Sequence, residues 1–344
     1  MNLTVTVQPA GRSFEVARDE AILPAAIRQG IGLPYGCKDG ACGSCKSRLL
    51  EGRVIHGAHQ LKALSVAEED AGYILTCCAT PQTDCAIEQR QVTAVGQFPI
   101  VKMPARVSTL QRMAPDVMVV TLQLPANQVF RYHAGQYVEF ILRDGARRSY
   151  SMANAPDDLP TSMELHIRHM PGGKFTDHVF GAMKEKEILR LEGPYGSFFL
   201  REDNDRPIVL LASGTGFAPI KALIEHMRAK GIEHRPTTLY WGARRPADLY
   251  LHGWAEQAAA ELPWLRYVPV LSDVTSEDGW PGRTGFVHRS VLADLPDLSG
   301  HEVYACGVPI MVESARRDFV SQAGLPEEAF YADAFTSEAD KHVA

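Results

Sequence analysis

Four cysteines near the start of the chain constrain its fold more than any other feature. Cys37, Cys42 and Cys45 follow the spacing C-x4-C-x2-C, and 31 further residues separate Cys45 from Cys77. This spacing is one that holds a [2Fe–2S] cluster, which needs four thiolates around a compact core. The segment between them is rich in glycine, which tolerates the positive φ angles of a tightly curled loop. We therefore predict that these four cysteines bind a [2Fe–2S] cluster.

The neighbouring residues Cys77 and Cys78 leave the fourth ligand ambiguous on spacing alone. A zinc site and a redox disulfide are the alternative interpretations of the motif. Zinc usually takes paired C-x2-C units, and this segment has one such unit. A chain with seven cysteines, six of them crowded from Cys37 to Cys85, indicates metal ligation in a reducing compartment.

Composition narrows the class of protein. Of 344 residues, 45% are apolar and 22% are charged, with a formal net charge of −6 and no basic run. This profile is typical of a soluble globular protein and argues against nucleic acid as a partner. No secretory signal and no apolar stretch of membrane-spanning length is visible. We expect a cytoplasmic protein without a membrane partner.

Patterning along the chain predicts three folded regions. Apolar residues alternate with polar ones over residues 3–7, and a short helix is expected over residues 19–30. An aperiodic segment with glycine and two prolines, residues 94–107, indicates a linker near residues 94–102, and the short β-type runs from there onward suggest a barrel. From residue 205 onward, strands and helices alternate, which predicts a doubly wound parallel sheet.

A glycine turn opens that last region. Gly214-Thr215-Gly216 follows a buried apolar strand and precedes an amphipathic helix that is capped at Gly231. Backbone amides at a helix N-terminus bind phosphate groups, so the turn predicts a pyrophosphate site. It lacks the third glycine and the downstream acid of the dinucleotide fingerprint.

The N-terminal region resembles plant-type ferredoxins over about residues 1–93. The segment YILTCCATP is similar to the LTC that carries the last cluster ligand in that family, which favours Cys77. The resemblance implies a β-grasp fold.

The rest of the chain resembles the ferredoxin–NADP reductase superfamily. RRSYSMAN matches its R-x-Y-S motif. The resemblance implies that Arg148 pairs with the FAD pyrophosphate, that Tyr150 packs on the isoalloxazine ring and that Ser151 bonds near flavin N5. The segment HMPGGKFTDHVF resembles the family's glycine loop, which implies further pyrophosphate contacts from the following residues: Gly172, Gly173, Thr176 and, from nearby, Arg168.

The nucleotide region shows the same likeness. GTGFAP resembles the family's GTGxAP turn, and YACGVPIMV resembles its CG segment beside the nicotinamide, here Cys306 and Gly307. Phe335 stands where the family has an aromatic residue that covers the flavin. Ser151, Cys306 and Phe335 are thus candidates for the reacting site. NADPH-dependent members carry a serine-arginine pair where this chain has Ser272 and Asp273, and a carboxylate would repel a 2′-phosphate, which favours NADH over NADPH.

The order of the regions resembles reductase components of multi-component oxygenases, of the benzoate dioxygenase and phenol hydroxylase type, and also CDP-6-deoxy-Δ3,4-glucoseen reductases. It implies an oxidoreductase that passes electrons from NADH through FAD and the [2Fe–2S] cluster to a protein acceptor, either an oxygenase component or a sugar dehydratase. A non-catalytic electron-carrier subunit and a zinc-binding adaptor are the alternative functions. The expected architecture is a multidomain α+β and α/β chain: a β-grasp ferredoxin domain (1–93), a linker (94–102), an FAD-binding β-barrel (103–203), a doubly wound NAD(P)H-binding domain (204–335) and a tail (336–344).

Overall fold

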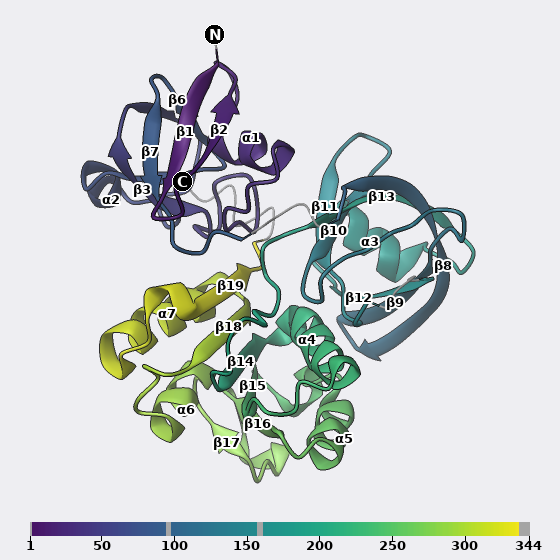
Figure 1. The fold of residues 1–344 in the computed structure, drawn as a ribbon. Helices are drawn as coiled ribbons and strands as arrows, with labels where there is room; N and C mark the ends of the chain where they lie inside the picture. The colour runs from purple at the N-terminus through teal and green to yellow at the C-terminus, as the bar shows by residue number, and fades with distance from the viewer. Residues whose placement is uncertain (1, 94–97, 157–160, 337–344) are drawn as a thin grey trace. The chain divides into compact units, whose positions relative to one another are not determined.

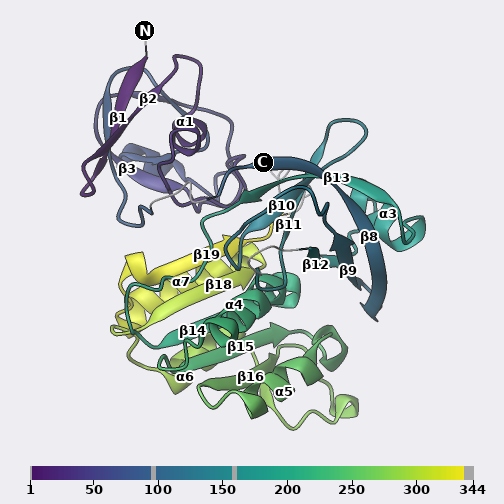
Figure 2. The ribbon, with the colours of Figure 1, turned by 45° about the vertical axis from the view of Figure 1, so that its right-hand side comes forward.

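The computed structural model describes residues 2–93, 98–156 and 161–336. Residues 94–97 of the expected linker and 337–344 of the expected tail lie outside the described residues. Figures 1 and 2 follow the chain from its purple N-terminus to the yellow strand near its C-terminus.

The chain divides into two compact units. One unit consists of Met1–Phe98, Gly196–Phe198 and Asp333–Ala344, and the other of Pro99–Tyr195 and Phe199–Ala332. The second unit therefore contains both the antiparallel sheet and most of the parallel sheet described below.

The first unit is built on a mixed five-stranded sheet of the β-grasp type, with strand order β2-β1-β7-β3-β5. The central strands β1 and β7 are parallel, whereas β1 pairs antiparallel with β2. Val5 and Val7 of β1 are fully buried, as the alternation in the sequence predicts. The elements are β1 (Leu3–Gln8), β2 (Arg12–Val16), α1 (Ile22–Arg28), β3 (Lys46–Glu51), β4 (Val54–His56), α2 (Val66–Asp70), β5 (Tyr73–Leu75), β6 (Ala79–Pro81) and β7 (Cys85–Glu88).

The second unit begins with a six-stranded antiparallel sheet of order β11-β10-β13-β8-β9-β12. A bridge between Met152 and Leu165 joins the chain after β11 to β12, so the sheet closes into a barrel around an apolar core. Strand β8 begins at Val101, inside the segment expected to be a linker. The elements are β8 (Val101–Ala114), β9 (Val117–Gln123), β10 (Tyr137–Ile141), β11 (Arg147–Ser151), β12 (Ser162–Arg168), α3 (Lys174–Gly181) and β13 (Ile188–Tyr195).

A second six-stranded sheet, of order β17-β16-β15-β14-β18-β19, confirms the doubly wound architecture. Strands β14, β15, β16 and β18 run parallel, and α4 and α5 cover one face while α6 and α7 cover the other (Figure 1). The elements are β14 (Ile208–Ser213), η1 (Gly214–Gly216), α4 (Phe217–Lys230), β15 (Thr237–Ala243), η2 (Pro246–Asp248), α5 (His252–Glu261), β16 (Leu265–Leu271), η3 (Ser276–Asp278), β17 (Arg283–Thr284), α6 (Val287–Asp294), β18 (Glu302–Gly307), α7 (Pro309–Ala323), η4 (Glu327–Ala329) and β19 (Phe330–Ala334).

One helix differs from the sequence-based expectation. The pattern predicts a helix over residues 247–262, but α5 begins at His252 after the short turn η2. Leu249 and Tyr250, which lie between the two, are buried. From this segment the Tyr250 hydroxyl bonds to His166 of β12, a tertiary contact that a local pattern does not reveal.

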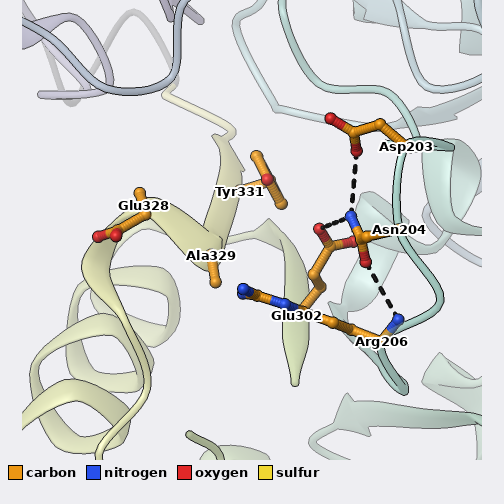
Figure 3. Close-up of a pocket in the computed structure, with 7 residues that line it drawn as sticks. All are labelled: Asp203, Asn204, Arg206, Glu302, Glu328, Ala329 and Tyr331. Carbon is orange, nitrogen blue, oxygen red and sulfur yellow. Dashed lines mark hydrogen bonds between the residues drawn. The ribbon is translucent and has the colours of Figure 1, made fainter. Parts of the chain in front are cut away.

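An ion pair is buried where the chain enters the parallel sheet. Arg235 is 1% exposed and Glu302 is 3% exposed, and Arg235 Nη2 lies 2.8 Å from Glu302 Oε2. Arg235 also donates to the carbonyl oxygens of Arg201 and Arg206, so it holds the segment that precedes β14. Asn204 donates to Glu302 from the same segment (Figure 3).

We predict that Arg235→Met lowers the free energy of unfolding of this domain by about 3–5 kcal/mol, because it leaves a buried carboxylate without its partner. All four tryptophans of the chain lie in this domain, so tryptophan fluorescence during urea titration reports on it: Trp241, Trp254, Trp264 and Trp280.

The control is Arg228→Met, since the Arg228–Glu261 pair is exposed and contributes about 0–1 kcal/mol. An equal effect of the two substitutions would contradict a special role for the buried pair. The double variant Arg235→Met/Glu302→Leu should recover part of the loss.

Candidate functional site

The four predicted cluster ligands lie in the first unit as two pairs. The Sγ atoms of Cys45 and Cys77 are 3.3 Å apart. The amide of Cys37 donates to Cys42 Sγ at 3.4 Å, and the amide of Ala41 donates to Cys37 Sγ at 3.3 Å. Among the residues that the structure describes, no three Cys, His, Asp or Glu side chains converge as one metal site. The donor set still fits an iron–sulfur cluster, because it combines four thiols with amides aimed at sulfur.

The loop that carries these cysteines depends on left-handed backbone. Lys38, Gly40 and Gly43 have φ angles of 65°, 76° and 74°. A Cβ on Gly40 would lie 2.9 Å from both the Ala58 carbonyl oxygen and Cys78 Sγ. The absence of a side chain at this glycine therefore lets the loop pack closely beside the thiols.

The thiols of Cys37 and Cys42 interact with each other. Their hydrogen bond lowers the pKa of Cys42 and raises the pKa of Cys37. The thiolate is the form that binds metal, so this pair is predisposed to ligation.

Two adjacent thiols compete for the fourth position. Cys77 is buried next to Cys45, while Cys78 is half-buried with its Sγ atom 3.4 Å from Cys77 Sγ. The contact with Cys45 favours Cys77 as the ligand and leaves Cys78 as a neighbour of the loop.

The R-x-Y-S residues lie on β11, at one edge of the barrel sheet. Tyr150 packs against Phe140 and Phe175, with ring centroids 5.9 and 5.3 Å away, and burial raises its pKa. Arg148 is half-buried and donates to the Arg147 carbonyl oxygen, and Ser151 is buried at the end of the strand. A cation, an aromatic ring and a hydroxyl thus follow one another along one short strand, a set of groups that suits a flavin nucleotide.

The predicted phosphate loop lies directly before α3, with Gly173 as its N-cap. The Thr176 hydroxyl donates to the Met170 carbonyl oxygen at 2.9 Å, so it holds the loop itself. A Cβ on Gly173 would lie 2.7 Å from Thr176 Oγ1, whereas Gly172 has open space around it. The first backbone amides of α3 directly follow this tight loop, and they are the groups that would suit an anion.

Arg168 lies between the barrel and the glycine turn. Its Nε is 2.7 Å from Asp116 Oδ2, and its Nη2 is 3.9 Å from Asp248 Oδ1. Its Nη1 would be 2.8 Å from a Cβ on Gly214. The structure therefore brings Arg168 next to the nucleotide turn, and its place near the flavin phosphates stays a prediction.

The glycine turn forms η1 at the C-terminal end of β14. A Cβ on Gly216 would lie 2.2 Å from the Cys306 carbonyl oxygen, and one on Gly307 would lie 2.1 Å from Ser213 Oγ. Two glycines thus let β14 and β18 end side by side. The chain winds in opposite directions from these neighbouring strands, and nucleotides bind at such a switch point.

Two further predicted residues lie at or just after the ends of β18 and β19. Cys306 is fully buried on β18, directly before Gly307, which has a φ angle of 139°. Phe335 follows β19 directly and is half-buried. Their contacts with nicotinamide and flavin stay predictions.

In the expected ribose pocket, Arg245 lies beside Asp273. Arg245 follows β15, and its guanidinium lies 3.6 Å from both Asp273 and Asp278. The amide of Asp273 donates to the Arg244 carbonyl oxygen at 3.0 Å, which fixes the two loops together. Two carboxylates therefore offset the charge of Arg245.

Sequence reasoning missed a buried polar group between the barrel and α4. His166, which has no ligand-type spacing in the sequence, is buried and hydrogen-bonds to Glu164 and Tyr250. Glu164 also pairs with Lys221. The i,i+4 spacing of Lys221 and Glu225 is the one local signal for this group, and it is equally typical of an exposed helix face.

Figure 3 shows a pocket that lies apart from the predicted cofactor sites. It has a volume of about 250 Å³ and lies at Glu302, the first residue of β18, at the opposite end of the sheet from the glycine turn.

In the parts of the chain that the structure describes, no helix has the length and apolar character needed to cross a membrane.

Three family models match consecutive parts of the chain. A 2Fe-2S iron-sulfur cluster binding domain matches residues 5–82, an oxidoreductase FAD-binding domain matches 104–200, and an oxidoreductase NAD-binding domain matches 210–317. The fold and these domains define an NAD-, FAD- and [2Fe–2S]-dependent oxidoreductase. The zinc-adaptor alternative is not supported.

Known proteins match the chain over nearly its full length. The chain is 40% identical to the CDP-6-deoxy-L-threo-D-glycero-4-hexulose-3-dehydrase reductase of Yersinia pestis over 97% of this chain and 99% of that protein. It is 35% identical to the phenol hydroxylase P5 protein of Acinetobacter pittii over 99% and 96% of the two chains. The crystal structure of the Amycolatopsis cytochrome P450 reductase GcoB matches with a TM-score of 0.77 and 34% identity, covering 97% of this chain and 99% of that one.

The chain belongs to the family of ferredoxin reductase-type electron-transfer components, which join a 2Fe-2S domain to FAD-binding and NAD-binding domains. It transfers electrons to partner proteins, as members of this family do. The family confirms an oxidoreductase rather than a non-catalytic carrier.

We predict that Cys77→Ser removes the [2Fe–2S] cluster, because a hydroxyl is a poor substitute for a thiolate on iron. FAD content and NADH-dependent reduction of a small dye should remain. The iron content and the EPR spectrum of the reduced protein measure the loss. The matched control is Cys78→Ser, which should keep the cluster; the reverse pattern would assign the ligand to Cys78.

Proposed function

We propose that this chain oxidises NADH, in preference to NADPH, and delivers single electrons to a CDP-6-deoxy-hexulose dehydrase-type partner protein. The observation that carries the proposal is the union of three cofactor domains in one chain, over the full length of relatives with this order. When bound, FAD accepts a hydride and releases electrons singly, and the cluster passes them on. The 40% identity to a hexulose-dehydrase reductase, against 34–35% to oxygenase reductases, favours the dehydrase as acceptor.

The residues of the chain orient the reactants rather than supply acid or base. Arg148 and the first amides of α3 would hold the flavin pyrophosphate, because guanidinium and helix N-termini favour phosphate. Tyr150 would pack against the flavin and Ser151 would hydrogen-bond to it. The turn at Gly214–Gly216 would bind the nicotinamide nucleotide, and the four cysteines would hold the cluster.

The experiment uses the purified holoprotein with NADH and three acceptors under anaerobic conditions. We expect rapid reduction of cytochrome c, faster turnover with a CDP-hexulose dehydrase than with an oxygenase component, and no turnover without nucleotide. A preference for an oxygenase component would replace the proposed acceptor with the second candidate, since the phenol hydroxylase relative serves such a system by its name. Absence of turnover with every acceptor would contradict the reductase function.

Asp273 bears on the choice of nucleotide. We predict that Asp273→Arg raises kcat/KM for NADPH relative to NADH by about tenfold or more, because it replaces a charge that repels the 2′-phosphate with one that attracts it. Steady-state kinetics with each nucleotide measure the ratio. Asp278→Asn is the control, since it removes the other carboxylate near Arg245 and should change the ratio less. An unchanged ratio in Asp273→Arg would place the ribose pocket elsewhere.

A further inference from the structure

A buried polar cluster joins the barrel to the nucleotide domain inside the second unit. We call it the Lys221 cluster. Lys221 and Glu225 lie on α4, Glu164 and His166 lie on β12, and Tyr250 lies between η2 and α5. None of these residues belongs to a predicted cofactor site.

Lys221 is the centre of this cluster and is only 6% exposed. Its Nζ lies 2.5 Å from Glu225 Oε1, 3.1 Å from Glu164 Oε1 and 3.3 Å from the Ala153 carbonyl oxygen. An ammonium group has three N–H donors, so these three acceptors satisfy it. Two of the three belong to the barrel. The amide of Ala155 donates to Glu225 Oε2 at 3.0 Å, which adds a barrel contact in the other direction.

His166 extends the cluster toward the glycine turn. Its Nε2 lies 2.9 Å from Glu164 Oε1, and its Nδ1 lies 2.7 Å from the Tyr250 hydroxyl. Burial lowers the pKa of His166, so the neutral ring donates from Nε2 to the carboxylate and accepts from tyrosine at Nδ1. Burial acts to raise the pKa of Glu164, but His166 and Lys221 together bring it down to about 2, so it is a carboxylate.

Tyr250 connects the cluster to the nucleotide turn through aromatic packing. Its ring meets Trp241 edge to face, with centroids 5.3 Å apart. Trp241 stacks on Phe217, the first residue of α4, with centroids 3.9 Å apart. The Trp241 Nε1 donates to the Gly214 carbonyl oxygen at 3.1 Å. Continuous contacts therefore run from barrel strand β12 to the glycine turn.

Both ends of the cluster lie close in sequence to groups that would hold the reactants. Ala153, which accepts from Lys221, comes two residues after Ser151, and its amide donates to the Glu164 carbonyl oxygen at 2.8 Å. Lys221 itself comes five residues after Gly216 on the same helix. The cluster thus links the strand predicted to contact the flavin to the helix predicted to bind the nicotinamide nucleotide.

Stability alone is a weak reason for such a cluster. Replacing a buried ion pair with apolar side chains of similar volume is often neutral or stabilising, because burial of charge has a large desolvation cost. Hydrogen bonds to a buried ammonium differ from apolar contacts in fixing direction and distance. The distinctive contribution of the cluster is therefore orientation.

We propose that Lys221 is a positioning residue that sets the separation between the nicotinamide and flavin rings for hydride transfer. The proposal rests on the flavin-reduction step of the proposed function. Hydride transfer requires the reacting atoms within about 3–3.5 Å, and a misplacement of about 1 Å lowers the rate about a hundredfold. Removal of the ammonium frees two barrel contacts of α4 and lets the glycine turn move relative to the flavin strand.

The test is Lys221→Met in the holoprotein, which keeps the length of the side chain and removes its charge. Anaerobic stopped-flow spectroscopy of flavin reduction separates the limiting reduction rate at saturating NADH from the apparent NADH affinity. We expect the limiting rate to fall about tenfold to a hundredfold. FAD content, cluster content and NADH affinity should stay within about threefold of the unchanged protein. The matched control is Lys230→Met, the same substitution at an exposed position at the end of α4.

A milder variant, Glu225→Gln, keeps an oxygen acceptor for the Ala155 amide and removes one charge. We expect a smaller fall in its limiting rate, with the same retention of cofactors, and it decides the question if Lys221→Met does not fold. An unchanged limiting rate in either folded variant, or a loss explained by lower NADH affinity or lower FAD content, would overturn the proposal. Failure of NADH to reduce the flavin of the unchanged protein would instead contradict the proposed function.

Discussion

The nucleotide domain depends on how closely two neighbouring strands end beside each other. A side-chain carbon on Gly216 or Gly307 would lie little more than 2 Å from the backbone or side chain of the adjacent strand, a distance that no atom pair tolerates. Because both positions are glycine, β14 and β18 finish together, and α4 starts directly above them. The backbone amides of the turn, which we predict to bind phosphate, take this arrangement because the two strands pack closely together.

Directional polar contacts supplement the apolar packing at two places in the second unit. Arg235 and Glu302 hold the chain that enters the parallel sheet, and the Lys221 cluster holds α4 against the barrel. Apolar burial supplies most of the folding free energy but specifies direction poorly. Buried charges need their partners at defined distances, so each cluster fixes one segment relative to another. This matters in a reductase, because electron and hydride transfer depend on separation.

Local sequence predicted most of the fold. The period of apolar residues gave the alternating strand β1 and the helix α4, including its end at Gly231, since these patterns reflect which face of an element is buried. The late start of α5 at His252 was not predictable from the local pattern, because the segment before it makes a tertiary contact, the hydrogen bond between Tyr250 and His166 of β12. Likewise the Thr176 hydroxyl bonds within its own loop, a contact that motif matching does not specify.

The sequence by itself determined the cofactor chemistry. The loop of Cys37, Cys42 and Cys45, the R-x-Y-S strand and the glycine turn each span a few residues, and short-range geometry is encoded in residue order. Only the tertiary structure decided which distant charges meet. Lys221 lies 57 positions after Glu164 in the chain. From the sequence alone both are expected on the surface, but in the structure they form an ion pair that is shielded from water. A buried charge is costly unless it is paired, so each of the two side chains needs the other. Burial depends on how the whole unit packs rather than on any one segment.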